Sequence, residues 1–230
     1  MSLKVDFQAT ARTEQRTEGR LTLPIFVTAE NKSIVGAFGL LLGAVLYLGS
    51  NHFHFLEPRL LPMFWIDRTV PFVANTVWIY VSEYIYFITV YWLCRDWENA
   101  SRLFCSFFTL QVLSVLIFCL WPTTYPRGDF PLPADLNLLT KMLFTTLRQT
   151  DTPASCCPSL HVSSVYLCSF VFLREQRSKF KWIFLWSTLI ALSTLTTKQH
   201  YGIDVVAGLG MAILVYWFFQ TQVDFRSSGA

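Results

Sequence analysis

Long apolar stretches separated by short polar connections dominate the pattern along this chain of 230 residues. A helix that crosses a membrane needs about 20 mostly apolar residues, because it rises 1.5 Å per residue through a hydrocarbon layer of about 30 Å. This pattern predicts six spanning helices, at residues 33–50, 70–93, 103–121, 160–173, 180–196 and 201–219. The predicted fold is therefore all-α, a polytopic membrane bundle of six transmembrane helices between tails at 1–32 and 220–230.

The composition strengthens this prediction. Hydrophobic residues make up 53% of the chain and charged residues only 14%, whereas soluble domains carry about 25% charged residues. Such a composition excludes a disordered chain. The net charge of +3 gives no indication of a nucleic-acid partner. We expect an integral, multi-pass membrane protein surrounded by lipids, and the sequence leaves its oligomeric state open.

The distribution of Lys and Arg predicts the orientation. With six spans, the two tails and two of the connections lie on one side and carry twelve Lys and Arg residues, against six on the other side. Since cytoplasmic connections are enriched in these residues, both termini are expected in the cytoplasm. The long connection at 122–159 and the short turn near His200 then share the extracytoplasmic face. We expect the bacterial inner membrane, with the active site facing the periplasm.

The first polar feature is the segment Cys156-Cys157-Pro158-Ser159-Leu160-His161, at the start of the fourth predicted span. Ser159 can cap this helix, and the amides of a helix N-terminus favour an anion. His161 would lie beside such an anion and could give or take a proton near neutral pH. Alternatively, the segment is an ordinary helix cap followed by an interfacial histidine. The neighbouring Cys156 and Cys157 are interpreted as packing residues, because no Cys and His spacing matches a zinc site.

The second polar feature is the pair His200 and Asp204, at the start of the sixth predicted span. Residues four apart lie on one face of a helix, so the carboxylate can hydrogen-bond to one imidazole nitrogen and leave the other free for nucleophilic attack. An aspartate inside an apolar run is costly and therefore a functional candidate. A structural ion pair at a helix end is the alternative.

Together these features favour phosphoryl transfer. On the six-span model both histidines begin their helices at the same membrane face. His200 would attack phosphorus in line to form a phosphohistidine, and His161 would protonate the leaving oxygen. Fixed positive charge would hold the phosphate oxygens. This scheme requires no metal and no cofactor.

At these residues the chain resembles the type 2 phosphatidic acid phosphatase superfamily, over roughly residues 60–220. Its Pro-Ser-Gly-His motif is present as Pro158-Ser159-Leu160-His161, and the leucine is similar to the inositol phosphorylceramide synthase branch. Its third motif, Ser-Arg followed by His and Asp, is present as Ser193, Thr194, His200 and Asp204. The resemblance implies a six-helix membrane core.

The resemblance also implies roles for individual residues. His200 would be the nucleophile, Asp204 its orienting partner, His161 the general acid and Ser159 a phosphate contact. The family's first motif, Lys followed by Arg-Pro, has only Arg127 as a match.

Two phosphate-binding cations of the family are missing from their usual places. Leu120 replaces the lysine of the first motif, and Thr194 replaces the arginine of the third. Lys198, two residues before His200, is the best substitute as a phosphate-binding residue. Arg148 could also approach the headgroup from the long connection, within a stretch at 135–148 that could form an amphipathic helix. Lys198 could equally be a solvated loop charge or a contact to a lipid headgroup, and for Arg148 this interpretation is favoured.

Glu83 lies in the middle of the second predicted span. A carboxylate at that depth must be paired, protonated or exposed to water. It could contact a polar headgroup or an acceptor hydroxyl, or it could simply hydrogen-bond to a Tyr or Ser on a neighbouring helix.

These observations predict a membrane lipid phosphatase that hydrolyses a lipid phosphate monoester or pyrophosphate. The first alternative is a lipid phosphotransferase, similar to inositol phosphorylceramide or sphingomyelin synthases, that passes a phospho-headgroup to a lipid hydroxyl. The second is a non-catalytic lipid-binding membrane protein. Sequence alone does not identify the lipid.

Overall fold

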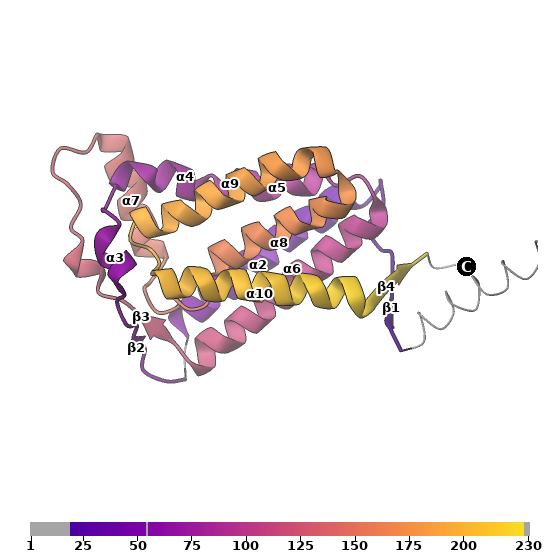
Figure 1. Ribbon diagram of the computed structural model, residues 1–230, viewed down its shortest axis with the longest axis horizontal. Coiled ribbons are helices and arrows are strands. Elements are labelled where there is room, and N and C mark those ends of the chain that lie inside the picture. The colour runs from indigo at the N-terminus through magenta and orange to yellow at the C-terminus, as the bar shows by residue number, and fades with distance from the viewer. Residues whose placement is uncertain (1–18, 54, 228–230) are drawn as a thin grey trace, which may run out of the picture.

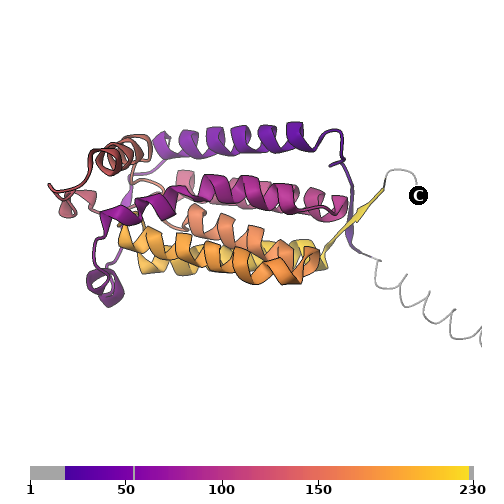
Figure 2. The same cartoon turned by 90° about the horizontal axis from the view of Figure 1, so that it is seen from above.

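The computed structural model describes residues 19–53 and 55–227, and this part of the chain is mostly helical. The long helices lie side by side with their axes roughly aligned (Figures 1 and 2). They are α2 (Lys32–His52), α6 (Trp97–Leu120), α8 (Leu160–Glu175), α9 (Arg177–Thr196) and α10 (Gly202–Thr221). Three shorter elements follow one another almost without interruption along the chain. They are η1 (Ala74–Thr76), α4 (Val77–Val81) and α5 (Glu83–Leu93). Every predicted apolar stretch thus overlaps with helical structure, although the second one begins before η1 and is divided at Ser82.

Helix α8 forms the centre of the bundle, and it packs against α5, α6, α9 and α10. Even its serine side chains, those of Ser163, Ser164 and Ser169, are buried. Gly208 allows α10 to approach it closely, because a Cβ atom at this position would lie 2.6 Å from the backbone oxygen of Ser159. This contact places the N-terminal ends of α8 and α10 next to each other.

The outer surface of the bundle is apolar. Large side chains such as Leu41 on α2 and Val206 and Leu214 on α10 are between 66% and 72% exposed. Within the described residues, three helices are long and apolar enough to cross a membrane, namely α2, α6 and α10. Exposed apolar surface on this scale is unfavourable in water and typical of a surface that contacts lipid or a partner.

The connections at one end of the bundle cover the start of α8 and α10. They contain α3 (Trp65–Thr69), η2 (Arg127–Asp129) and α7 (Leu138–Thr150). The strand β2 (Arg59–Leu60) pairs in parallel with β3 (Thr123–Thr124) in the same region. Helix α7 overlaps the amphipathic stretch that the sequence indicates.

A second small pairing lies at the opposite end of the bundle (Figure 1). There β1 (Leu21–Pro24) pairs in parallel with β4 (Val223–Arg226), and Arg20 forms an ion pair of 3.0 Å with Asp224. The prediction of a purely α-helical fold misses both strand pairs. Each joins segments far apart in the sequence, and such short strands show no periodicity that would identify them.

Candidate active site

The two predicted histidines lie together at the end of the bundle where α8 and α10 begin. Their ring centroids are 5.7 Å apart, and both side chains are buried. His161 belongs to the first turn of α8, and His200 lies in the turn before α10. The proximity of Gly208 to Ser159 holds these two helix starts together.

Asp204 is the partner of His200. Its Oδ2 atom lies 3.4 Å from Nδ1 of His200, a contact distance without the alignment of a hydrogen bond. The same oxygen accepts the backbone N–H of Tyr201 at 2.9 Å, and the carboxylate is fully buried. A carboxylate fixed in this way faces Nδ1, so that Nε2 is the nitrogen available for attack.

Ser159 caps α8, as predicted. Its Oγ atom accepts the backbone N–H of Val162 at 3.3 Å, and its own N–H donates to the backbone oxygen of Asp204 at 3.1 Å. This second bond connects the segment that carries His161 directly to the helix that carries Asp204. The two motifs therefore form one unit.

Glu83 has a partner that sequence reasoning did not name. Its Oε1 atom lies 2.9 Å from Nε2 of His161, and both side chains are buried. The hydroxyl of Tyr80 lies 3.4 Å from the other nitrogen, Nδ1, of the same imidazole. Each histidine of the site therefore has its own carboxylate. The signal in the sequence was the acidic residue inside an apolar run, which requires a buried partner.

Arg127 is held by a network of polar groups. Its guanidinium donates to the Tyr125 hydroxyl at 3.0 Å and to the carboxylate of Asp151 at 3.2 Å, and also to the backbone oxygen of Asp151. The Asp151 carboxylate in turn accepts hydrogen bonds from Tyr47 at 2.6 Å and Asn51 at 3.0 Å. Sequence reasoning missed Asp151, which lies in a loop without a recognisable pattern.

The charge of Arg127 persists in this environment. Burial opposes it, but Tyr125 and Asp151 outweigh burial and raise the pKa of the guanidinium above its ordinary value. Arg127 is therefore a permanent cation in the loop beside the histidines, as a phosphate-binding role requires.

Lys198 is buried and anchored to α3. Its ammonium donates to the backbone oxygens of Asp67 and Val70, at 2.6 Å each, and lies over the ring of Phe130. Burial lowers its pKa, and the nearby Asp67 offsets this effect only in part. An ammonium has three N–H donors, and two of them hold the C-terminal end of α3.

Arg148 is directed towards the loop that precedes α7. It donates to the backbone oxygen of Phe130 at 2.8 Å and lies 4.8 Å from the ring centroid of Phe144. Burial and the charge of Arg127 lower its pKa. The structure thus places Arg148 beside the Arg127 network, with its guanidinium held by the loop.

A cavity of about 270 Å³ opens beside His161. Glu83, Asp151 and His161 line it, and most of the remaining lining residues are apolar side chains of α2, α5 and α6. A molecule with a charged head and an apolar body fits this distribution. Within the described residues, no group of three or more His, Cys, Asp or Glu side chains is placed to hold a metal ion, and the six cysteines are free.

Comparison with known proteins agrees with these motifs. No curated protein matches the chain. The model of the PAP2 superfamily matches residues 51–218, which include both histidines, Asp204, Glu83 and Arg127. The match covers most of the chain, and the chain therefore belongs to the PAP2 superfamily, the type 2 phosphatidic acid phosphatases.

Proposed function

We propose that this protein is an integral membrane lipid phosphatase that hydrolyses a lipid phosphate monoester or pyrophosphate through a phosphohistidine. Its superfamily comprises phosphoesterases and phosphotransferases. The observation that carries the proposal is the pair of buried histidines, with rings 5.7 Å apart and a carboxylate beside each. One of them, His161, lines a largely apolar cavity together with Glu83.

In the first step, Nε2 of His200 attacks phosphorus, and the bond from phosphorus to the lipid oxygen breaks. Glu83 engages Nε2 of His161, so the proton for the leaving oxygen comes from Nδ1, near the Tyr80 hydroxyl. The products are the lipid alcohol and a phosphohistidine. Asp204 stabilises the positive charge that develops on His200.

In the second step, water attacks the phosphohistidine from the position that the lipid oxygen has left. His161 now accepts the proton of this water, and the bond from phosphorus to Nε2 of His200 breaks. Arg127, Ser159 and the remaining N–H of Lys198 are the groups that we assign to the phosphate oxygens. Such fixed donors stabilise the charge of the transition state.

We place the bundle across the bacterial inner membrane with six spans, both termini in the cytoplasm and the histidines at the periplasmic face. The exposed apolar side chains of α2, α6 and α10 support membrane insertion. Helix α8 is packed inside the bundle, so its composition need not be that of a helix surrounded by lipid. Helix α9 also presents exposed apolar side chains, such as Trp182 and Leu192, on its outer face. The excess of Lys and Arg on the side of the termini supports the orientation.

A lipid phosphotransferase is the second candidate. Leu160 replaces the glycine of the common motif, and the cavity beside His161 could hold a lipid alcohol in place of water. The first step would be the same, except that the group held on His200 keeps its headgroup as a phosphodiester. The two activities therefore differ in the group that His200 holds and in the nucleophile of the second step, which is water in the phosphatase and a lipid hydroxyl in the phosphotransferase.

The test is phosphate release by the purified protein in detergent, from a panel of lipid phosphates in the presence of EDTA, beside His200→Ala. We expect release that survives EDTA and disappears in the variant. Transfer of a phospho-headgroup from an added phosphodiester lipid to an added lipid alcohol, without phosphate release, would establish the phosphotransferase. Neither release nor transfer would leave a non-catalytic lipid-binding protein, and release unaffected by His200→Ala would refute the assignment of the nucleophile.

A further inference from the structure

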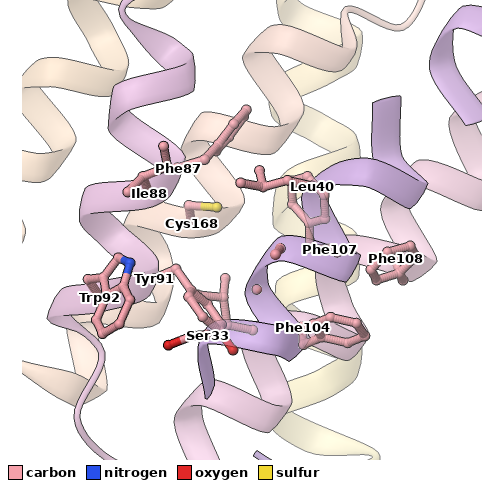
Figure 3. A pocket seen from close by; sticks show the side chains of 14 residues that line it. Ser33, Leu40, Phe87, Ile88, Tyr91, Trp92, Phe104, Phe107, Phe108 and Cys168 are labelled. Carbon is pink, nitrogen blue, oxygen red and sulfur yellow. The ribbon is translucent and has the colours of Figure 1, made fainter. Parts of the chain in front are cut away.

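The cavity beside His161 continues along the bundle. A second cavity of about 250 Å³ shares Leu40, Phe87, Ile88 and Phe107 with it. Figure 3 shows that side chains of α2, α5 and α6 line this second cavity. The two cavities together follow α2 from Ser33 to Leu48, a length of about 22 Å at 1.5 Å per residue.

The two cavities together form a groove, and this groove ends beside His161, the proposed general acid, and not beside His200, the proposed nucleophile. Its lining includes His161 and Glu83, whereas His200 lies across from them. In an in-line displacement the leaving oxygen stands opposite the attacking nitrogen. The lipid part of a substrate attacked by His200 therefore extends from His161 into the groove.

The groove is not uniformly apolar. Gln111 on α6 and Ser164 on α8 line it, although they are only 6% and 2% exposed. Among residues 19–53 and 55–227, neither Oε1 of Gln111 nor Oγ of Ser164 has a hydrogen-bond partner, and the same is true of Oε2 of Glu83. Buried polar groups are nearly always paired, so three unpaired ones around one cavity indicate a ligand that pairs them.

We propose that this groove binds the lipid alcohol of the substrate, and that Gln111 and Ser164 hydrogen-bond to a polar linkage next to the phosphorylated end of that lipid. The inference rests on the proposed function and narrows its substrate class. An amide linkage can donate its N–H to Oε1 of Gln111 and accept the hydroxyl of Ser164 through its carbonyl oxygen. An ester linkage has only acceptor oxygens, so it can accept from the Ser164 hydroxyl and from the amide nitrogen of Gln111 but leaves Oε1 unpaired. A prenyl phosphate carries neither linkage, because only hydrocarbon follows its phosphorylated carbon.

The test compares three lipids of similar hydrocarbon length in mixed micelles: phosphatidate, ceramide 1-phosphate and a prenyl phosphate. We expect the wild-type protein to favour at least one linkage-bearing lipid over the prenyl phosphate. Gln111→Leu and Ser164→Ala should each reduce kcat/KM for that lipid about threefold to tenfold, the value of one hydrogen bond. Most of this loss should be a rise in KM, while turnover of the prenyl phosphate stays unchanged.

Ser114→Ala is the matched control. Ser114 is also a buried serine without a hydrogen-bond partner in the described part of the chain, but it lines neither cavity. Its substitution should change none of the three activities. Preference for phosphatidate would identify an ester linkage, and preference for ceramide 1-phosphate an amide linkage.

Equal turnover of the prenyl phosphate, or an equal loss for all three lipids in both variants, would overturn the inference. A binding measurement distinguishes a wrong groove assignment from a wrong proposed function. The same lipids are titrated against His200→Ala by tryptophan fluorescence, with and without Gln111→Leu. A linkage-dependent affinity without any turnover would retain the groove assignment and reject the phosphatase, whereas the absence of that dependence would reject the groove assignment.

Discussion

The Oε1 atom of Glu83 lies 2.9 Å from Nε2 of His161, and this contact joins α5 to the start of α8. A second carboxylate, that of Asp204 in the first turn of α10, faces the other histidine, His200, which lies four residues earlier in the chain. The two contacts differ in origin, since one is local in sequence and the other spans 78 residues. They have the same physical effect, because each carboxylate orients an imidazole and supports its positive form.

Glu83→Gln tests this contact. The amide keeps the volume and can still hydrogen-bond to the imidazole, but it removes the negative charge that supports a protonated His161. We expect kcat to fall about 100-fold, at the lower end of what a general acid contributes, with little change in KM. Asp224→Asn, which removes a carboxylate from the ion pair at the far end of the bundle, should leave kcat unaltered. Equal kinetics for wild type and Glu83→Gln would show that the contact is structural only.

Asp204→Asn separates the orienting role of Asp204 from its role as a helix cap. An asparagine oxygen can still accept the N–H of Tyr201, so we expect the melting temperature to remain close to that of the wild type. The loss of charge beside Nδ1 of His200 should reduce kcat by about 10³-fold to 10⁴-fold, as for other histidines that depend on a carboxylate. Release of the lipid alcohol in single-turnover experiments measures this step. A variant that unfolds, or one that retains full activity, would contradict this division of roles.

Local rules were sufficient to predict much of the site. Ser159 is a helix cap and His200 and Asp204 form an i, i+4 pair, and both relationships depend only on neighbouring residues. The partner of Glu83 could not be predicted, because several helices carry polar residues. The apolar pattern of a helix does not indicate which other helices pack against it. Asp151 was missed for a similar reason, since it lies after α7 in a loop whose residues follow no period.

The same limit applies to the cations and the strands. The sequence shows that Lys198 is two residues from His200, but it does not show which groups the ammonium contacts. In the structure Lys198 has a left-handed backbone conformation, with φ of +53°, and its ammonium donates to backbone oxygens at the end of α3. The pairing of β1 with β4 joins the two ends of the described chain, and only the tertiary fold brings them together. Apolar helices were thus predictable, whereas contacts between distant segments were not.

Ser159→Ala tests whether Ser159 does more than cap α8. Loss of a helix cap costs about 1 kcal/mol, so thermal unfolding should show a modest decrease in stability. Asn137→Ala removes the corresponding cap of α7, where the Asn137 side chain accepts the N–H of Thr140 at 2.9 Å. Both variants should lose similar stability, but only Ser159→Ala should lose activity, by about tenfold or more, if its hydroxyl also contacts phosphate. Parallel losses of activity in the two variants would reduce Ser159 to a cap.

Gly208→Ala tests whether the close approach of α8 and α10 sets the distance between the histidines. An added Cβ atom would lie 2.6 Å from the backbone oxygen of Ser159 and 3.3 Å from the backbone nitrogen of Ser163, and backbone atoms cannot rotate away. The two helix starts must therefore separate. Since small displacements of reacting groups cost about 100-fold in rate, we expect a loss of that order in kcat. Gly210→Ala, two residues further along α10, introduces the same methyl group where no atom of a neighbouring segment in the described structure lies within 4 Å of it. It should retain full activity, and its small gain in helix propensity should leave stability equal or higher. A fully active Gly208→Ala would show that the histidines tolerate a wider spacing, and that the packing of α8 on α10 does not position the chemistry.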